Sequence, residues 1–135
     1  MDNNYSRNAV FSRICDDISA NHTSVYVSSI YTPKPSSFPA VFIYEIGRFS
    51  PSRNVTFMND DEQWQSTFEV QVITNDTSSR QSKAYALLET IKKSFKSMFY
   101  IEISENPVSI QDETTYRLVA RFRRTIGGGD TLPSE

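Results

Sequence analysis

The sequence predicts an α+β fold: a mixed, mainly antiparallel sheet of about four to five strands, with a long helix on one face and a second helix near the N-terminus. Two observations carry this prediction. Residues 68–72 (FEVQV) alternate apolar and polar side chains, which is the pattern of a half-buried strand. After a polar turn, apolar residues recur every three or four positions, as on one face of a helix: Ala84, Leu87, Leu88, Ile91, Phe95 and Met98.

The long helix is predicted over residues 78–98. Ser78, followed three residues later by Gln81, fits a capping box, in which each side chain bonds a free backbone N–H of the first turn. Charged residues occupy the remaining surface of this helix: Lys83, Glu89, Lys92, Lys93 and Lys96. About 20 residues at 1.5 Å rise make a rod of roughly 30 Å, which is long enough to cross a sheet.

The segments before this unit predict one helix and two strands. Residues 6–19 place apolar side chains at helical spacing, and Asn21-His22 ends that helix. Residues 25–30 are rich in β-formers and stop at a proline-rich segment that cannot be a central strand. Residues 40–46 are apolar on both faces, which predicts a central strand.

Two further strands are predicted after the long helix. Residues 99–103 alternate, and Glu105-Asn106-Pro107 is expected to turn the chain. Residues 115–124 then form the last strand, with apolar residues on one face and arginines on the other.

Residues 1–126 are expected to form a single domain, and residues 127–135, which begin with three glycines, a flexible tail. Residues 47–63 show no period and predict an irregular loop. Loops of this length are commonly functional or disordered. The single cysteine, Cys15, excludes an intrachain disulfide and a cysteine-based zinc site.

The net charge of −2 is unevenly distributed. Residues 1–79 carry five basic and nine acidic side chains, whereas residues 80–124 carry nine basic and five acidic ones. Such a split is consistent with two complementary faces that associate head to tail. The longest apolar run, Val41–Tyr44, is far too short to cross a bilayer, so we expect a chain that stays on the cytoplasmic side and contacts no membrane.

No residue pattern favours catalysis. Cys15, Asp16 and the only histidine, His22, contain the groups of a nucleophilic site, but Cys15 falls near the buried stripe of its helix and His22 beyond its end. Asp60-Asp61-Glu62 lacks the alternating ligands and glycine of a calcium loop and reads as a solvated turn. Residues 127–129 open no helix and precede no lysine, which excludes a phosphate loop. We therefore expect no enzyme, no cofactor and no bound metal.

The arginines of the last predicted strand are the strongest basic cluster. On an exposed strand face, Arg117, Arg121 and Arg123 offer contacts to nucleic-acid phosphates. The alternative is that they pair with Glu69 and Gln71 on a neighbouring strand. The overall acidity of the chain favours the second reading.

The order of these motifs resembles the small tail terminator proteins of long-tailed bacteriophages, also called tail-to-head joining or tail completion proteins. The resemblance spans roughly residues 38–126 and rests on FPAVFIYEI at 38–46, FEVQVI at 68–73, the helix at 84–99 and YRLVARF at 116–122. Residues 49–63 match no motif of the family.

The resemblance implies an α/β protein that forms a hexameric ring, which caps the finished tail tube and offers a surface to the head connector. Its implied partners are copies of itself, the tail tube protein and the head–tail connector, with only passive contact to DNA in the channel. Its implied place is the head-proximal end of the tail in the virion, and the host cytoplasm during assembly. The residues expected at subunit or partner interfaces are Phe49, Arg53, Phe57, Met58, Asp60, Asp61, Glu62, Arg117, Arg121 and Arg123.

Two other functions remain open at this point. One is a neighbouring connector, such as a head-completion or stopper subunit. The other is a small nucleic-acid-binding α+β domain that uses the arginine strand.

Overall fold

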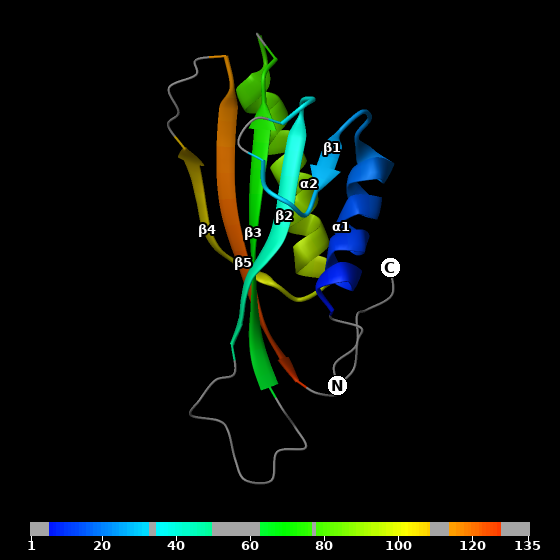
Figure 1. Cartoon of the computed structure of the whole chain (residues 1–135), viewed down its shortest axis with the longest axis vertical. Helices are drawn as coiled ribbons and strands as arrows, with labels where there is room; N and C mark the ends of the chain where they lie inside the picture. Colours follow the sequence, from blue (N-terminus) through cyan, green and yellow to red (C-terminus); the bar gives the residue numbers. More distant parts are fainter. Residues whose placement is uncertain (1–5, 33–34, 50–62, 77, 109–113, 128–135) are drawn as a thin grey trace.

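The computed structural model describes residues 6–32, 35–49, 63–76, 78–108 and 114–127. The order of elements agrees with the prediction, and the fold is α+β (Figure 1). The elements are α1 (Arg7–Asn21), β1 (Tyr26–Ser28), β2 (Ala40–Phe49), β3 (Gln63–Thr74), α2 (Arg80–Ser97), β4 (Ile101–Val108) and β5 (Tyr116–Gly127).

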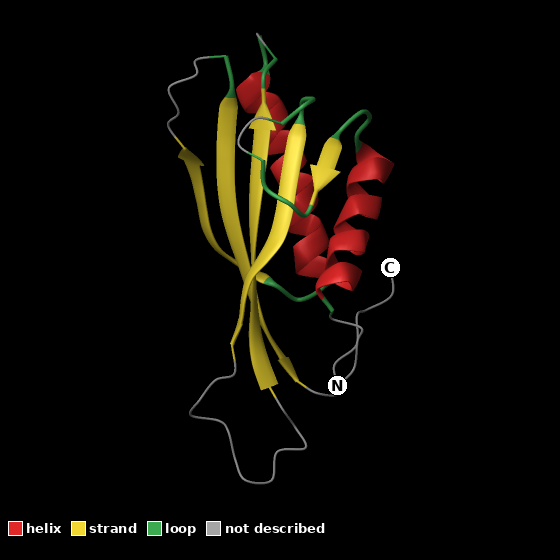
Figure 2. Ribbon diagram, viewed as in Figure 1, coloured by secondary structure: helices red, strands yellow, loops and turns green. Residues whose placement is uncertain are grey.

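The five strands form one sheet in the order β1-β2-β3-β5-β4 (Figure 2). β1 runs parallel to β2, and the other three pairings are antiparallel. β3 and β5 are the long central pair, with Phe68 opposite Phe122 and Glu69 opposite Arg121. Both helices lie on the same face of this sheet, which we call the helix face; the other is the open face.

The predicted irregular loop at 47–63 is shorter than expected. Gly47–Phe49 continue β2 after a bulge between Glu45 and Gly47, and β3 begins at Gln63. Gly47 through Phe49 pair with residues of β3, so backbone hydrogen bonding continues where the side chains show no period. Gly127, predicted as the start of the tail, is the last residue of β5. The single domain over 1–126 stays a prediction, and residues 128–135 lie outside the described part.

The predicted capping box of the long helix is wrong. The N-cap of α2 is Ser79, whose side chain makes no capping hydrogen bond. Asp76 instead orders the turn before the helix: its Oδ1 accepts the backbone N–H groups of Ser78 and Ser79 at 3.0 and 3.1 Å, and its Oδ2 contacts Lys83 Nζ at 2.7 Å. The hydrogen bond from Lys83, with those backbone donors, holds the pKa of Asp76 well below its usual value.

The predicted turn at Glu105–Pro107 is also wrong, because these residues belong to β4. β4 is an edge strand, where a proline without an N–H is tolerated. Lys92 of α2 reaches this strand and pairs with Glu105 and, at 3.6 Å, with Glu102. Lys92 therefore lies against the sheet and not on the solvent side of the helix.

The core lies between the helix face and the two helices. α1 contributes Val10, Ile14 and Ile18, and the predicted stripe of α2 is buried in full. The buried apolar side chains that β2, β3 and β5 contribute to this core are Val41, Ile43, Trp64, Phe68, Val70, Val72, Leu118, Ala120, Phe122 and Ile126. The sheet and α2 thus form the two main layers of the domain.

Truncation of the α2 stripe tests this packing. Leu88 and Ile91 are at most 1% exposed, so Leu88→Ala and Ile91→Ala should each lower the free energy of unfolding by about 2–5 kcal/mol through cavity formation. Lys93→Ala, at an exposed position of the same helix, should change it by less than about 0.5 kcal/mol. Urea unfolding measures all three. A larger loss for Lys93→Ala than for Leu88→Ala would contradict the assigned helix faces.

Candidate interaction surface

The predicted arginines lie together on the open face of the sheet. Arg117, Arg121 and Arg123 alternate along β5 with buried apolar residues that point to the helices, as the sequence predicted. Glu69 of β3 is opposite Arg121, and Thr67 is opposite Arg123. The open face thus brings a basic strand against a strand from the acidic half of the chain.

Side chains of three strands form a hydrogen-bonded network on this face. Arg121 Nε donates to Glu69 Oε1 at 2.9 Å, and the Tyr44 hydroxyl donates to the other oxygen of Glu69. Gln71 Nε2 donates to the Tyr44 hydroxyl at 2.7 Å. The same Gln71 accepts a hydrogen bond from Arg117 through its carbonyl oxygen.

Arg117 also ties the network to the segment that follows β1. Its Nη1 donates to the Tyr31 hydroxyl at 3.1 Å, and its guanidinium lies 5.6 Å from the centre of the Tyr31 ring. The Tyr31 ring meets Phe42 edge to face at 5.5 Å. The alternative considered for the arginines, pairing with Glu69 and Gln71 across strands, is therefore what the structure shows for Arg121 and Arg117.

Burial and the Glu69 carboxylate raise the pKa of Tyr44 from 10 to about 12. The phenol therefore stays protonated at neutral pH and remains a donor to Glu69. Because Glu69 joins Tyr44 to Arg121, it holds together the side chains of all three strands. The network ties β2, β3 and β5 together on the face that no helix covers.

Arg123 differs from its two neighbours. Among the residues that the structure describes, it forms no ion pair and no side-chain hydrogen bond. It lines a shallow hollow of about 390 Å³ at the edge of the sheet, together with Gln65, Phe99, Ile101, Arg124 and Thr125. Of the three predicted arginines, Arg123 is the one available to a partner.

The remaining predicted interface residues are not brought into this surface. Phe49 is the last residue of β2, but its side chain is outside the described part. The others lie outside the described residues: Arg53, Phe57, Met58, Asp60, Asp61 and Glu62.

The sequence analysis did not predict a group of exposed apolar side chains at the edge strand β4. Phe99 and Ile101 are 64% and 58% exposed, and Ile103 and Val108 are also exposed. The alternation of residues 99–103 was visible in the sequence, but it does not say whether either face of an edge strand meets a partner. Exposure of several neighbouring apolar side chains is typical of a contact surface.

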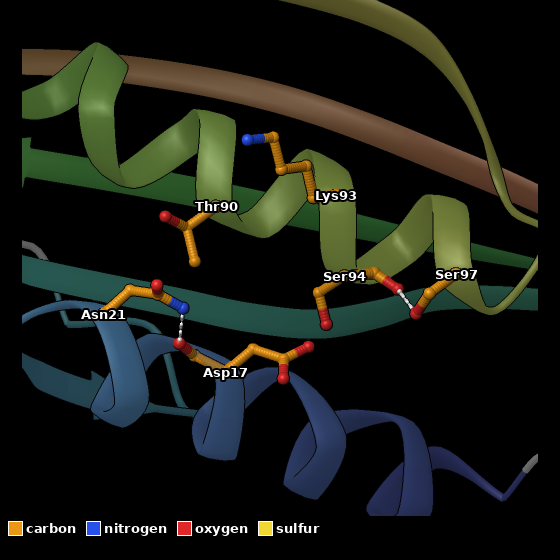
Figure 3. A pocket seen from close by; sticks show the side chains of 6 residues that line it. All are labelled: Asp17, Asn21, Thr90, Lys93, Ser94 and Ser97. Atoms are coloured by element: carbon orange, nitrogen blue, oxygen red, sulfur yellow. Dashed lines mark hydrogen bonds between the residues drawn. The ribbon is translucent and has the colours of Figure 1, made fainter. Parts of the chain in front are cut away.

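A polar cleft of about 250 Å³ lies between the two helices (Figure 3). Asp17 and Asn21 of α1 face Thr90, Ser94 and Ser97 of α2, and Asn21 Nδ2 donates to the Asp17 carbonyl oxygen at 2.8 Å. Ser94 is 2% exposed, and its hydroxyl has no partner in the described part of the chain. The cleft has room for water, which satisfies buried hydroxyls in many proteins.

The groups considered for catalysis do not assemble into a site. A ring nitrogen of His22 lies 2.8 Å from Thr90 Oγ1, so the histidine links the end of α1 to α2. Burial, with a smaller effect of Asp16, raises the pKa of the Cys15 thiol, which is the reverse of an activated nucleophile. Within the described residues, no cluster of His, Cys, Asp or Glu is suited to hold a metal ion, and no helix has the length and apolarity needed to span a membrane.

The architecture is shared with a virion protein of known structure. No protein-family model and no curated protein sequence matches this chain. A chain in the structure titled "Virion of native gene transfer agent (GTA) particle" aligns over 92% of this chain and 99% of its own length. The TM-score is 0.57 and the sequence identity 12%. Both chains therefore have the same fold over nearly their whole length.

Substitutions at Glu69 and Arg121 test the network. Glu69→Ala removes the acceptor of two donors and should lower the free energy of unfolding by about 1–3 kcal/mol. Arg121→Ala removes one half-exposed partner and should cost only about 0.2–1 kcal/mol. Arg123→Ala is the control, with an expected change below about 0.5 kcal/mol. Urea unfolding at neutral pH measures each variant, and equal losses for Glu69→Ala and Arg123→Ala would contradict the network.

Proposed function

We propose that this chain is a structural component of a phage-like virion and acts as a tail terminator. In this role, copies of the chain form a ring that caps the finished tail tube and joins it to the head connector. The observation that carries the proposal is the nearly full-length likeness to a chain of a gene transfer agent virion. The order of motifs that resembles the terminator family supports the same role.

We propose that the described surface serves assembly. The open face carries a polar network between strands, and the exposed apolar residues gather at a sheet edge. The alternative function, nucleic-acid binding, has less support than it had from the sequence alone. Arg117 and Arg121 already form a hydrogen bond and an ion pair within the chain. We therefore propose that any contact with DNA in the ring channel is passive.

Deletion of the gene for this chain, from the genome that encodes the particle, tests the proposal. Without a terminator, tail growth is not capped, so electron micrographs should show tails of irregular length that are not joined to filled heads. Loss of a head-completion or stopper subunit should instead leave tails of normal length. Particles of normal appearance would contradict both assignments, and complementation with the intact gene is the control.

The unevenly charged segments are proposed to meet between neighbouring subunits. Because Arg121 pairs with Glu69 in its own chain, Arg123 is the better candidate to contact the acidic residues Asp60, Asp61 and Glu62 of a neighbour. An exposed pair contributes only about 0.2–1 kcal/mol, but a ring repeats the contact at every interface.

Charge reversal at Arg123 measures this contribution. Arg123→Glu should shift the population toward monomer in light scattering at low salt, and Asp60→Lys with Asp61→Lys in the same chain should partly restore assembly. Arg7→Glu, an exposed reversal at the start of α1, is the matched control and should have no effect. If Arg123→Glu assembles as well as the unmodified chain, these charges do not join subunits.

A further inference from the structure

The sheet has two edges whose backbone groups are unequally covered. On one side β4 is the last strand, and no described strand pairs with its outer edge. On the other side β1 is three residues long and pairs only with Ala40, Val41 and Phe42 of β2. The rest of β2, from Ile43 onward, has no strand on its outer side within the described residues.

Both edges carry exposed apolar side chains, several at β4 and one on β2. Ile101 and Ile103 belong to β4, and Phe99 directly precedes it. On the opposite edge, Ile46 of β2 is 42% exposed. Long apolar edges invite pairing with another chain, and proteins that avoid such pairing cover or charge them.

Part of β4 and part of β2 cannot pair with a further strand along their outer edges. These two parts lie at the same height in the sheet. Through the paired strands, Asn106, Pro107 and Val108 of β4 are level with Phe42, Val41 and Ala40 of β2. β1 covers that half of β2, and Pro107 has no N–H to donate. The open halves are level as well: Ile101 matches Gly47, and Ser104 matches Tyr44.

We infer that the first half of β4 (Ile101–Ser104) pairs with the uncovered part of β2 (Tyr44–Gly47) of a second copy of this chain. β4 and β2 run in opposite directions within one sheet, because three antiparallel pairings separate them. Rotation about an axis along the strands preserves these directions, so the joined strands are antiparallel. The contact deepens the proposed function, since it rests on the ring and names the surface that forms it.

Level edges favour a closed ring. A head-to-tail contact generates a ring if each step is a pure rotation and a helical filament if each step also rises. Because the open half of β4 is level with the open half of β2, pairing them requires no rise along the strands. It also keeps the helix face and the open face of successive copies on the same side, since residues at one level point to the same face.

The charges at this contact are partly offset within each chain. At equal height, Glu102 of one copy faces Glu45 of the next. Glu102 lies 3.6 Å from Lys92, and Glu45 lies 3.1 Å from Arg48. The repulsion between like charges across strands is therefore reduced. Ile46 and Ile103, each the unpaired residue at a bulge, are left to make apolar contacts.

Cross-linking tests the contact on the full chain with Cys15→Ser. The variant with Ile46→Cys and Ile103→Cys, treated with a short thiol-reactive cross-linker, should give a ladder of covalent oligomers that ends at one fixed number of subunits. Either cysteine alone should give almost no product, because the contact joins β4 of one copy to β2 of the next and so brings no two identical positions together. Lys93→Cys with Ile103→Cys is the matched control, since Lys93 is exposed on α2, which packs over the central strands β3 and β5.

Three results would overturn the inference. A double-cysteine variant that stays monomeric at every concentration excludes the contact. Efficient dimers of Ile103→Cys alone show that β4 pairs with β4, and a ladder without an upper limit shows a filament. If gene removal gives the terminator defect and rings are seen in micrographs while any of these results holds, the proposed function stands and only this contact is wrong.

Lysines at the edge provide a second measurement. Ile101→Lys with Ile103→Lys places charges where apolar contact is expected, and both sites are exposed in the single chain, so folding should be unaffected. The concentration needed for half assembly should rise roughly tenfold or more in light scattering. Gln81→Lys with Ser82→Lys, at exposed positions in the first turn of α2, is the control, and equal assembly of the edge and control variants would contradict the inference.

Discussion

The packing of Phe95 against the sheet is the contact on which the rest of the domain depends. Its ring stacks on Phe122 of β5 at 4.3 Å and an interplanar angle of 11°, and it meets Tyr100 at 5.1 Å. Phe68 of β3 contacts both Phe95 and Tyr100. Aromatic side chains bury large areas and favour defined geometries, so this cluster fixes the position of α2 over the two central strands.

The same cluster sets where β4 begins. The chain leaves α2 through Phe99, whose φ of 66° lies in the left-handed region, and the N–H of Tyr100 bonds the carbonyl of Phe95 at 3.0 Å. This reversal puts Tyr100 in the core and leaves Phe99 in solvent beside Arg124. The exposed apolar group at the edge is therefore a direct consequence of how the helix ends.

The sequence predicted the fold class and the order of elements because hydrophobic periodicity records which side of each segment is buried. It failed where contacts distant in sequence decide. It also failed at the start of α2, where Ser79 is the N-cap without a side-chain capping bond and Asp76, two residues before Ser78, accepts the N–H groups of Ser78 and Ser79. The local sequence around Pro107 predicts a turn, but its place in an edge strand depends on β5, which follows it in the chain.

The sequence predicted only part of the candidate surface, because local periodicity does not say which strands are neighbours. Alternation along the last strand placed the arginines on one face, but their partners depend on which strand lies beside them. Glu69 and Arg121 are 52 residues apart and meet because β3 and β5 are neighbours. The difference in charge between the two halves of the sequence is thus partly used inside one chain, a result that composition alone does not reveal.

The attachment of α1 has a consequence for the motions of the domain. α1 contacts α2 much more than it contacts the sheet, and the cleft between the helices contains the Ser94 hydroxyl, which has no partner among the described residues. An element held by few contacts opens with less free energy than the whole domain. α1 is therefore expected to detach as a local unfolding unit while the sheet and α2 remain native, with faster amide hydrogen exchange than in β3 or β5.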